Sequence, residues 1–297
     1  MPLFDIKQTR LTFSELIFRY WPTQVGLSRL KKILSITEPS NNLVIKKLKG
    51  FPLKLKFNPV TYMGTFIYYR GLYEEGCIKK LRQLMKPGMT FIDIGANVGL
   101  YTIIAAHLVK ETGSVIAFEP QTELIKLINE NIELNKLNNI TLISCALGEE
   151  NGEAELFQVS STNDGQATLR INRDEQTFGG VIKVPIHTLS SILIELKVEN
   201  VDGIKIDTEG AELYVLNGFL PWLDSHTPPY FIFFECIEEH LLRFRHNTKM
   251  LFEFFWTLDY SIYCLYRGRW RRVKNPADHK SYNYSSDMLA IHNSRNL

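Results

Sequence analysis

The segment from residue 91 to residue 99, which reads FIDIGANVG, constrains the fold more than any other part of this chain. An apolar run ends in Asp93, a turn containing Gly95 and Gly99 follows, and a helical pattern of apolar residues begins directly afterwards. This order predicts a strand, a tight turn and a helix, in which the glycines let the backbone approach a ligand at the helix N-terminus. A second acid, Glu119, closes the next apolar run, where a carboxylate can accept both hydroxyls of a ribose. Together they predict a pocket for a nucleoside-containing cofactor.

The charge pattern of this turn selects among such cofactors. A dinucleotide fingerprint reads G-x-G-x-x-G, and its glycines serve a pyrophosphate. Here Asp93 stands directly before the turn and would repel a pyrophosphate, but it can hold an ammonium group or a water bound to one. S-adenosylmethionine carries an amino-acid head, a sulfonium and a ribose without any phosphate, so it is the predicted cofactor. A nicotinamide-dependent oxidoreductase is a weaker alternative.

Five ordered motifs in this sequence resemble those of a known family. They are LYE at 72–74, FIDIGANVG at 91–99, AFEP at 117–120, CALG at 145–148 and IKIDTEGAE at 204–212. Their order and spacing resemble the FkbM-type S-adenosylmethionine-dependent methyltransferases from about Gly71 to the C-terminus. Thr208 departs from that pattern, since the family usually carries Val there. The resemblance implies a class I methyltransferase fold, S-adenosylmethionine as cofactor and O-methylation.

The apolar runs predict an α/β fold with a Rossmann-like, seven-stranded, mostly parallel sheet and helices on both faces. Helical patterns cover 98–109 and 121–136, and a further helix runs from Glu75 to Met85. The last two strands are joined by a basic turn region without a convincing helix, which suits an antiparallel closing strand. The expected strands are residues 90–94, 114–118, 140–144, 202–206, 230–234, 260–266 and 287–292.

The pattern outside the sheet predicts two additions to a methyltransferase domain at 71–297. Residues 1–70 form an N-terminal accessory segment that is helical over 1–50 and then a β-hairpin, in which residues 53–57 pair with 66–69. Residues 150–190 alternate in polarity and read as a β-rich insertion, which we interpret as a flap near the acceptor pocket.

The charge distribution bears on possible partners. The chain of 297 residues has a net charge of +2, which gives no general attraction to nucleic acid. Residues 1–60 hold eleven Lys or Arg and three acids, a net charge of +8, and residues 267–274 form a second basic cluster. We favour solvated faces for both, with weak contact of the N-terminal segment with a membrane surface or an anionic substrate as the alternative.

Other features bear on compartment, metal content and assembly. The four cysteines are far apart, the N-terminus does not read as a signal peptide, and no apolar stretch is long enough for a bilayer, so we expect a cytoplasmic protein. No His and acid cluster shows metal-ligand spacing, so no metal site is predicted, and metal dependence is left open. The oligomeric state is left open.

Candidate cofactor-binding residues follow from the strand ends and the resemblance. Ligands of open α/β sheets bind beyond the carboxyl ends of the strands, and four predicted strands end there in acids. The predicted cofactor-binding residues are Glu74, Asp93, Gly95, Ala96, Asn97, Gly99, Glu119, Pro120, Ala146, Leu147 and Asp207.

Candidate catalytic residues are Asp207, Lys205, Glu235 and His240. Lys205 and Asp207 lie two positions apart in a strand, so their side chains share one face. A buried lysine needs a charged partner, which Asp207, Glu209 or Glu235 could supply. Methyl transfer to an alcohol needs removal of the hydroxyl proton, for which these four residues are candidates.

The predicted function is O-methylation of a hydroxyl on a sugar, glycan or secondary metabolite, with a small-molecule or glycan acceptor. The alternatives are N-methylation of nucleic acid or protein, and a non-catalytic S-adenosylmethionine-binding module. A TPPY motif at 227–230 resembles the signature of methyltransferases acting on base amino groups. It precedes the fifth strand rather than following the fourth, so we interpret it as accidental.

Overall fold

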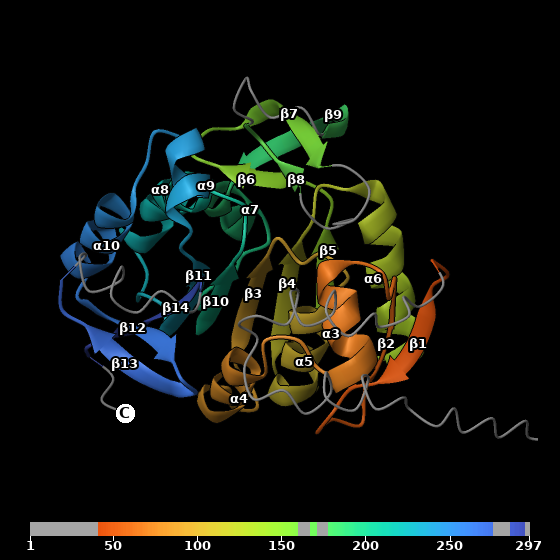
Figure 1. Cartoon of the computed structure of the whole chain (residues 1–297). Helices are drawn as coiled ribbons and strands as arrows, with labels where there is room; N and C mark the ends of the chain where they lie inside the picture. Colours follow the sequence, from red (N-terminus) through yellow and green to blue (C-terminus); the bar gives the residue numbers. More distant parts are fainter. Residues whose placement is uncertain (1–40, 160–166, 171–177, 276–285, 295–297) are drawn as a thin grey trace, which may run out of the picture.

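A central eight-stranded sheet organises the molecule (Figure 1). The computed structural model describes residues 41–159, 167–170, 178–275 and 286–294. The five strands on one side of the sheet run parallel, whereas β14 is antiparallel to both of its neighbours and β13 is antiparallel to β12. The strand order is β13 (Arg269–Val273), β12 (Tyr260–Tyr266), β14 (Asp287–His292), β11 (Phe231–Glu235), β10 (Gly203–Ile206), β3 (Thr90–Ile94), β4 (Ser114–Phe118) and β5 (Ile140–Ile143).

All seven predicted strands are present, which confirms the α/β fold with a mostly parallel sheet. The eighth strand, β13, lies in the basic region that was predicted to be a turn. Arg267 and Gly268 both adopt positive φ, at 48° and 75°, and form the tight connection between β12 and β13. A two-residue turn with positive φ at both positions has the twist that joins two antiparallel strands. The arginines that follow therefore form a strand, β13, at the edge of the sheet.

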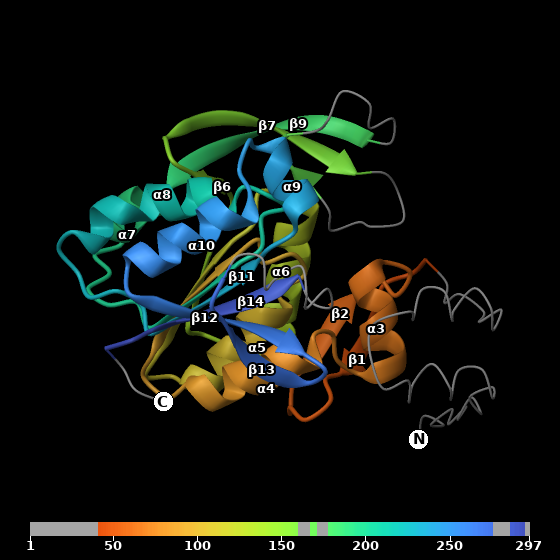
Figure 2. The same cartoon turned by 60° about the vertical axis from the view of Figure 1, so that its left-hand side comes forward.

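Helices cover both faces of the sheet, and each face has its own core (Figures 1 and 2). Side chains alternate along β3, so Phe91 packs in one core and Ile92 and Ile94 pack in the other. One face is covered by α4 (Glu75–Leu84), α5 (Leu100–Val109) and α6 (Thr122–Asn135). The other face is covered by α7 (Leu189–Glu195), α8 (Glu212–Leu223) and α10 (Thr248–Thr257), and the short α9 (Glu238–Arg243) follows β11.

The segment before α4 differs from the prediction. The predicted strand at 53–57 is β2 (Lys54–Phe57), but its partner is β1 (Val44–Lys47), which lies within the stretch predicted to be helical. Residues 66–69 belong to helix α3 (Tyr62–Arg70), because Thr61 caps its first turn and Gly71 ends it in the left-handed conformation. The predicted hairpin partner was therefore wrong. The amphipathic pattern before residue 41 lies outside the described residues.

A second sheet lies beyond the carboxyl ends of the central strands, at the top of Figure 1. Its order is β6 (Ala146–Gly148), β9 (Phe178–Thr188), β7 (Gly152–Val159) and β8 (Ala167–Thr168). Residues 150–190 were predicted to be β-rich, and three of these strands lie within them. Among the described residues, no helix has both the length and the apolar character to cross a membrane.

Candidate active site

A cavity of about 1090 Å³ opens at the carboxyl ends of β3, β4, β10 and β11, with residues of the second sheet on its wall. Single ligands occupy pockets of roughly 300–1,000 Å³, so this cavity has room for a cofactor and an acceptor. Of the predicted site residues, Gly99 and His240 do not line it. Those that do are Glu74, Asp93, Gly95, Ala96, Asn97, Glu119, Pro120, Ala146, Leu147, Lys205, Asp207 and Glu235.

The glycine turn after β3 is fixed by close backbone packing. Gly95 has a φ of 77°, and a Cβ at this position would lie 1.9 Å from the carbonyl oxygen of Asp207. Gly99 has a φ of 84° and begins α5 without a side-chain cap, and its Cα faces Ile128 rather than the cavity. Only glycine therefore fits at Gly95. Gly99 therefore shapes the turn and does not line the cavity. Its lack of a side chain leaves space for the buried Ile128.

Asp93 supplies an unsatisfied buried acceptor at the floor of the cavity. Its side chain is 1% exposed, and its Oδ2 accepts a hydrogen bond of 2.5 Å from the Thr102 hydroxyl. Its Oδ1 is buried and has no hydrogen-bond partner among the described residues. Burial raises the pKa of Asp93, although nearby Lys205 opposes this shift. Because a buried acceptor without a donor is costly, this atom suits a ligand that brings an N–H or O–H group.

Lys205 is the central cation of the site. Its Nζ lies 2.8 Å from Oδ2 of Asp207 and 4.7 Å from the centre of the Tyr101 ring. Burial lowers the pKa of Lys205, but the carboxylates of Asp207, Glu74 and Asp93 outweigh it and raise the pKa above its usual value. Lys205 therefore stays protonated, and it can neutralise carboxylates but cannot remove a proton.

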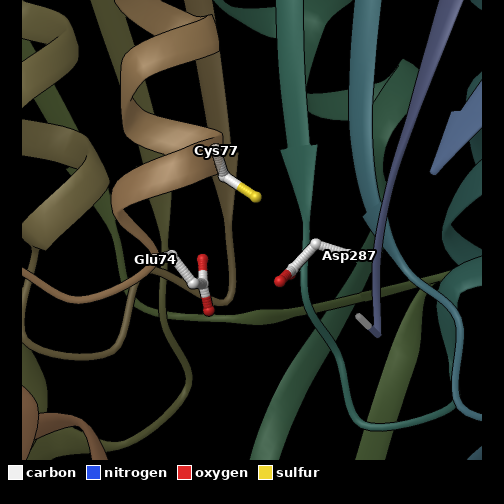
Figure 3. A group of neighbouring side chains, drawn as sticks. All are labelled: Glu74, Cys77 and Asp287. Carbon is white, nitrogen blue, oxygen red and sulfur yellow. The ribbon is translucent and has the colours of Figure 1, made fainter. Parts of the chain in front are cut away.

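Glu74 approaches the same lysine from the start of α4. It adopts a left-handed conformation with a φ of 49°, and its buried carboxylate accepts a hydrogen bond of 2.6 Å from Tyr101. Burial raises the pKa of Glu74, while Lys205 and the hydroxyls of Tyr101 and Tyr73 oppose that shift. Figure 3 shows the side chains of Glu74, Cys77 and Asp287 converging on one space.

Glu119 follows β4 and is 4% exposed. It accepts backbone hydrogen bonds from Asn97, at 2.9 Å, and from Gln121, at 3.0 Å. Burial outweighs these hydrogen bonds and raises the pKa of Glu119 to about 7. The carboxylate thus links the turn after β3 to the turn after β4, and it has lone pairs left for the two hydroxyls of a ribose.

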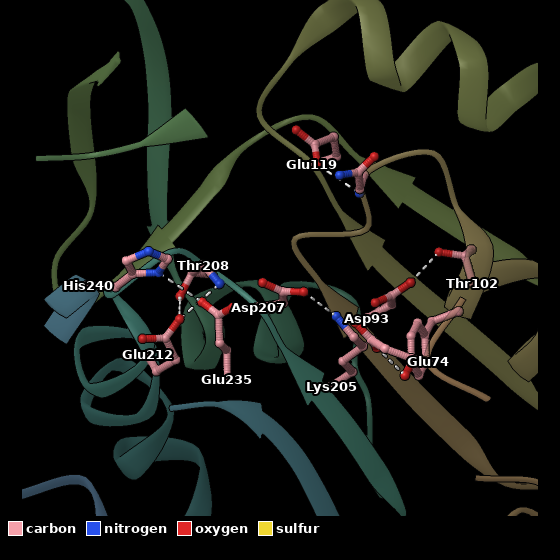
Figure 4. Close-up of polar contacts among 12 residues, drawn as sticks. Glu74, Asp93, Thr102, Glu119, Lys205, Asp207, Thr208, Glu212, Glu235 and His240 are labelled. Carbon is pink, nitrogen blue, oxygen red and sulfur yellow. Dashed lines mark hydrogen bonds and ion pairs between the residues drawn. The ribbon is translucent and has the colours of Figure 1, made fainter. Parts of the chain in front are cut away.

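A second group of acids surrounds the end of β10 and β11 (Figure 4). Nδ1 of His240 lies 3.0 Å from Oε2 of Glu209 and 3.2 Å from Oε2 of Glu235. Burial raises the pKa of Glu235 well above its ordinary value, and the neighbouring acids Asp207, Glu209, Glu212 and Asp287 raise it further. His240 thus contacts two residues of the cavity wall without lining the cavity itself.

The loop after β10 is held by Glu212, the last residue of the fifth motif. One carboxylate oxygen accepts hydrogen bonds from the Thr208 backbone and hydroxyl, both at 3.0 Å, and from the Gly210 backbone at 3.2 Å. Thr208 thus uses its hydroxyl, which Val lacks, to fix the loop. This loop presents Asp207 and Glu209 to the cavity.

Sequence reasoning missed several residues of the site. Glu212 stands in a quoted motif but was given no role, and Glu209 was considered only as a partner for Lys205, although three acids within six residues were a legible signal. Tyr101 and Thr102 lie within the helical pattern predicted at 98–109 and were given no role, and only their contacts with buried acids reveal their part in the site. Asp287 opens the last strand, and no local pattern places it beside Glu74.

Comparisons with known proteins show the family to which this chain belongs. The family model described as the Vibrio cholerae RfbT protein matches residues 54–267. The chain is 25% identical over 193 residues to Methyltransferase sdnD of Sordaria araneosa, covering 56% of this chain and 73% of that protein. It is 30% identical over 124 residues to a probable cobalt-precorrin-6B C(15)-methyltransferase (decarboxylating) of Sulfurisphaera tokodaii, covering 40% and 65% respectively.

A solved structure, Methyltransferase FkbM from Methylobacillus flagellatus, has a TM-score of 0.41 at 16% identity, covering 72% of this chain and 50% of that one. The curated relatives bear methyltransferase names, which confirms the predicted methyltransferase and its cofactor, S-adenosylmethionine, over the nicotinamide alternative. Since the matching family model covers most of the sequence, the chain belongs to the family represented by the Vibrio cholerae RfbT protein.

Proposed function

We propose that this protein methylates a hydroxyl group of a sugar, glycan or secondary metabolite, as an FkbM-type O-methyltransferase. The observation that carries the proposal is that two groups of acids line one cavity. Asp93 and Glu119 flank the glycine turn, whereas Asp207, Glu209 and Glu235 stand at or after the ends of β10 and β11. The first group suits an amino group and a ribose. The second suits an acceptor rich in hydroxyls, and we call the space beside it the acceptor end of the cavity.

The residues present fit S-adenosylmethionine. The unpartnered Oδ1 of Asp93 would accept from the amino group or from a water bound to it. Glu119 would accept from the ribose, and Ala146 and Leu147 would line the adenine. When bound, the cofactor supplies a methyl group activated by its sulfonium.

At the other end, Asp207 takes up the proton of the acceptor hydroxyl in this proposal. Its side chain is 31% exposed, the most open of the acids paired with Lys205, and it lines the cavity. Lys205 holds the carboxylate in place through their 2.8 Å ion pair, which leaves the second oxygen of Asp207 for a hydroxyl. Methyl transfer is an in-line displacement, so most of its rate depends on such positioning.

Aromatic side chains support a carbohydrate or other ring-bearing acceptor. Tyr62 and Tyr73 line the cavity, and their ring centres lie 6.1 Å apart in an edge-to-face arrangement. Such rings can pack against the apolar face of a sugar while carboxylates accept from its hydroxyls.

The test is transfer of a deuterated methyl group from S-adenosylmethionine to a panel of sugars, amino sugars, glycans, alcohol metabolites, nucleic acid and protein, read by mass spectrometry. We expect label on an oxygen, and we expect Asp207→Asn to lose at least about 100-fold in rate, the usual size of a general-base effect. Calorimetry with S-adenosylhomocysteine should show that this variant still binds the cofactor product. Label on nitrogen, or on nucleic acid or protein, would replace the proposal with N-methylation.

A further inference from the structure

Three potential metal ligands meet at the acceptor end of the cavity, and they come from separate segments. Glu209 lies in the loop after β10, Glu235 ends β11, and His240 lies on α9. The imidazole Nδ1 is 3.0 Å from Glu209 and 3.2 Å from Glu235, and one ligand atom from each residue lies within 4.8 Å of the others. Figure 4 shows the His240 side chain beside that of Glu235.

A protonated histidine between two carboxylates is the simplest account of these contacts, but the surrounding charge favours a stronger cation. The side chains of Glu209 and Glu235 are only 17% and 13% exposed. Like charges held this close in a half-buried site are costly unless a cation lies between them.

The donor set matches a divalent ion. One imidazole nitrogen and two carboxylate oxygens suit Mn²⁺ or Zn²⁺, and three protein ligands leave positions for water or substrate. Neighbouring residues hold the ligands in position. Glu212 accepts hydrogen bonds from the backbone N–H groups on both sides of Glu209. Gly210 has no side chain, so the loop packs directly on the backbone of His240.

We propose that Glu209, Glu235 and His240 bind one divalent cation at the acceptor end of the cavity. The two glutamates line the cavity, so the remaining coordination positions face the space left for the acceptor. The ion's role, unlike the site itself, rests on the proposed function: a bound cation would hold an acceptor oxygen and lower the pKa of its hydroxyl. His240 is then a ligand rather than a base.

A neighbouring group offers an internal control. Glu74, Cys77 and Asp287 also place three ligand atoms within 4.8 Å of one another (Figure 3). Burial, followed by the charges of Asp287 and Glu74, raises the pKa of the Cys77 thiol well above its ordinary value. A thiol must lose its proton to bind a metal, as a carboxyl must, but its pKa is several units higher before burial raises it further, so this group is the poorer site despite its geometry.

The test is titration of the 297-residue chain with Mn²⁺, with free Mn²⁺ measured by electron paramagnetic resonance. Zn²⁺ is then added as a competitor. We expect one ion per chain. Glu209→Gln and His240→Gln should each weaken binding by more than about tenfold, since even partners of metal ligands have effects of that size. Cys77→Ser should leave Mn²⁺ affinity unchanged.

Each sample is also titrated with S-adenosylhomocysteine, which separates this inference from the proposed function and shows that the variants are folded. Wild-type protein that binds S-adenosylhomocysteine but neither Mn²⁺ nor Zn²⁺ overturns the metal site alone. If Mn²⁺ binding survives in Glu209→Gln and His240→Gln but is lost in Cys77→Ser, the ion binds at Glu74, Cys77 and Asp287. That result also overturns the proposed site. If the wild-type protein binds the metal but not S-adenosylhomocysteine, the metal site is supported and the proposed function is contradicted.

Discussion

Asp93 and Lys205 occupy directly paired positions on the neighbouring parallel strands β3 and β10. Their side chains therefore lie on the same face of the sheet, beneath α5, where both are less than 7% exposed. Asp207 and Glu74 act on the same lysine from the ends of β10 and α4. One buried cation thus holds together three acids of the cavity, which links the stability of the sheet to the integrity of the site.

Replacement of this cation should destabilise the protein strongly. We expect Lys205→Met to lower the free energy of unfolding by ~3–5 kcal/mol, because it leaves buried carboxylates without a partner. Lys249→Met is the matched control: that side chain is 68% exposed and forms only a surface pair with Glu253. It should change stability by less than about 0.5 kcal/mol. Urea denaturation measures both, and similar values for the two variants would contradict the prediction.

Alanine substitutions at Gly95 and Gly50 should separate the cost of backbone strain from the cost of a steric clash. Both have positive φ, at 77° and 80°, so Gly→Ala imposes a similar strain of ~1–2 kcal/mol at each position. A Cβ at Gly50 meets nothing within 4 Å, whereas one at Gly95 meets the Asp207 carbonyl oxygen at 1.9 Å. We expect Gly95→Ala to cost ~1–3 kcal/mol more than Gly50→Ala and to abolish S-adenosylhomocysteine binding. Denaturation and calorimetry measure these effects, and equal costs would show that the turn can relax.

The strands and the cofactor end of the cavity were predictable from sequence because their signals are local. Asp93, the glycine turn and Glu119 each stand at the end of an apolar run, and parallel strands bring such ends together. The pairing of Asp93 with Lys205 was not predictable, because it depends on the register between two strands more than 100 residues apart. Sequence reasoning inferred that the lysine needs a partner but could not name all of its neighbours.

The errors arose where tertiary contacts override local pattern. Residues 66–69 are aromatic or β-branched, which favours a strand, but the cap at Thr61 and the left-handed Gly71 make them part of a helix. Glu209, Glu235 and His240 have no recognisable spacing in the sequence, since they come together only when three segments meet at the carboxyl ends of β10 and β11. The accessory role of residues 1–70 and the contacts of the basic N-terminal segment stay predictions.

Cofactor affinity should depend on pH through Glu119. The pKa of this buried carboxyl is raised to about 7, so in the unliganded protein it is mostly protonated at pH 6 and mostly ionised at pH 8. The ionised form accepts both ribose hydroxyls, so affinity should rise with pH, by about tenfold between these two values. In Glu119→Gln the rise should disappear. Calorimetric titration with S-adenosylhomocysteine at pH 6, 7 and 8 measures this, and a rise that persists in the variant assigns it to another group.

Two asparagines on α6 should differ in their importance for attaching the N-terminal strands. Asn131 exchanges hydrogen bonds with the Lys56 backbone and also donates to the Val98 carbonyl, whereas Asn135 exchanges a pair with the Lys54 backbone at an exposed position. Asn131 is fully buried, so Asn131→Ala leaves backbone groups without partners and water, and it should cost ~2–3 kcal/mol.

Asn135→Ala should cost less than about 1 kcal/mol, since water can replace the lost hydrogen bonds. Urea denaturation of both variants tests the difference, and hydrogen exchange of the β2 amides locates it. Exchange should become faster across β2 in Asn131→Ala while the amides of β3 stay protected, because β3 lies inside the main sheet. Equal destabilisation by the two variants, or equal loss of protection in β3, would mean that Asn131 supports the whole domain rather than the attachment of β2.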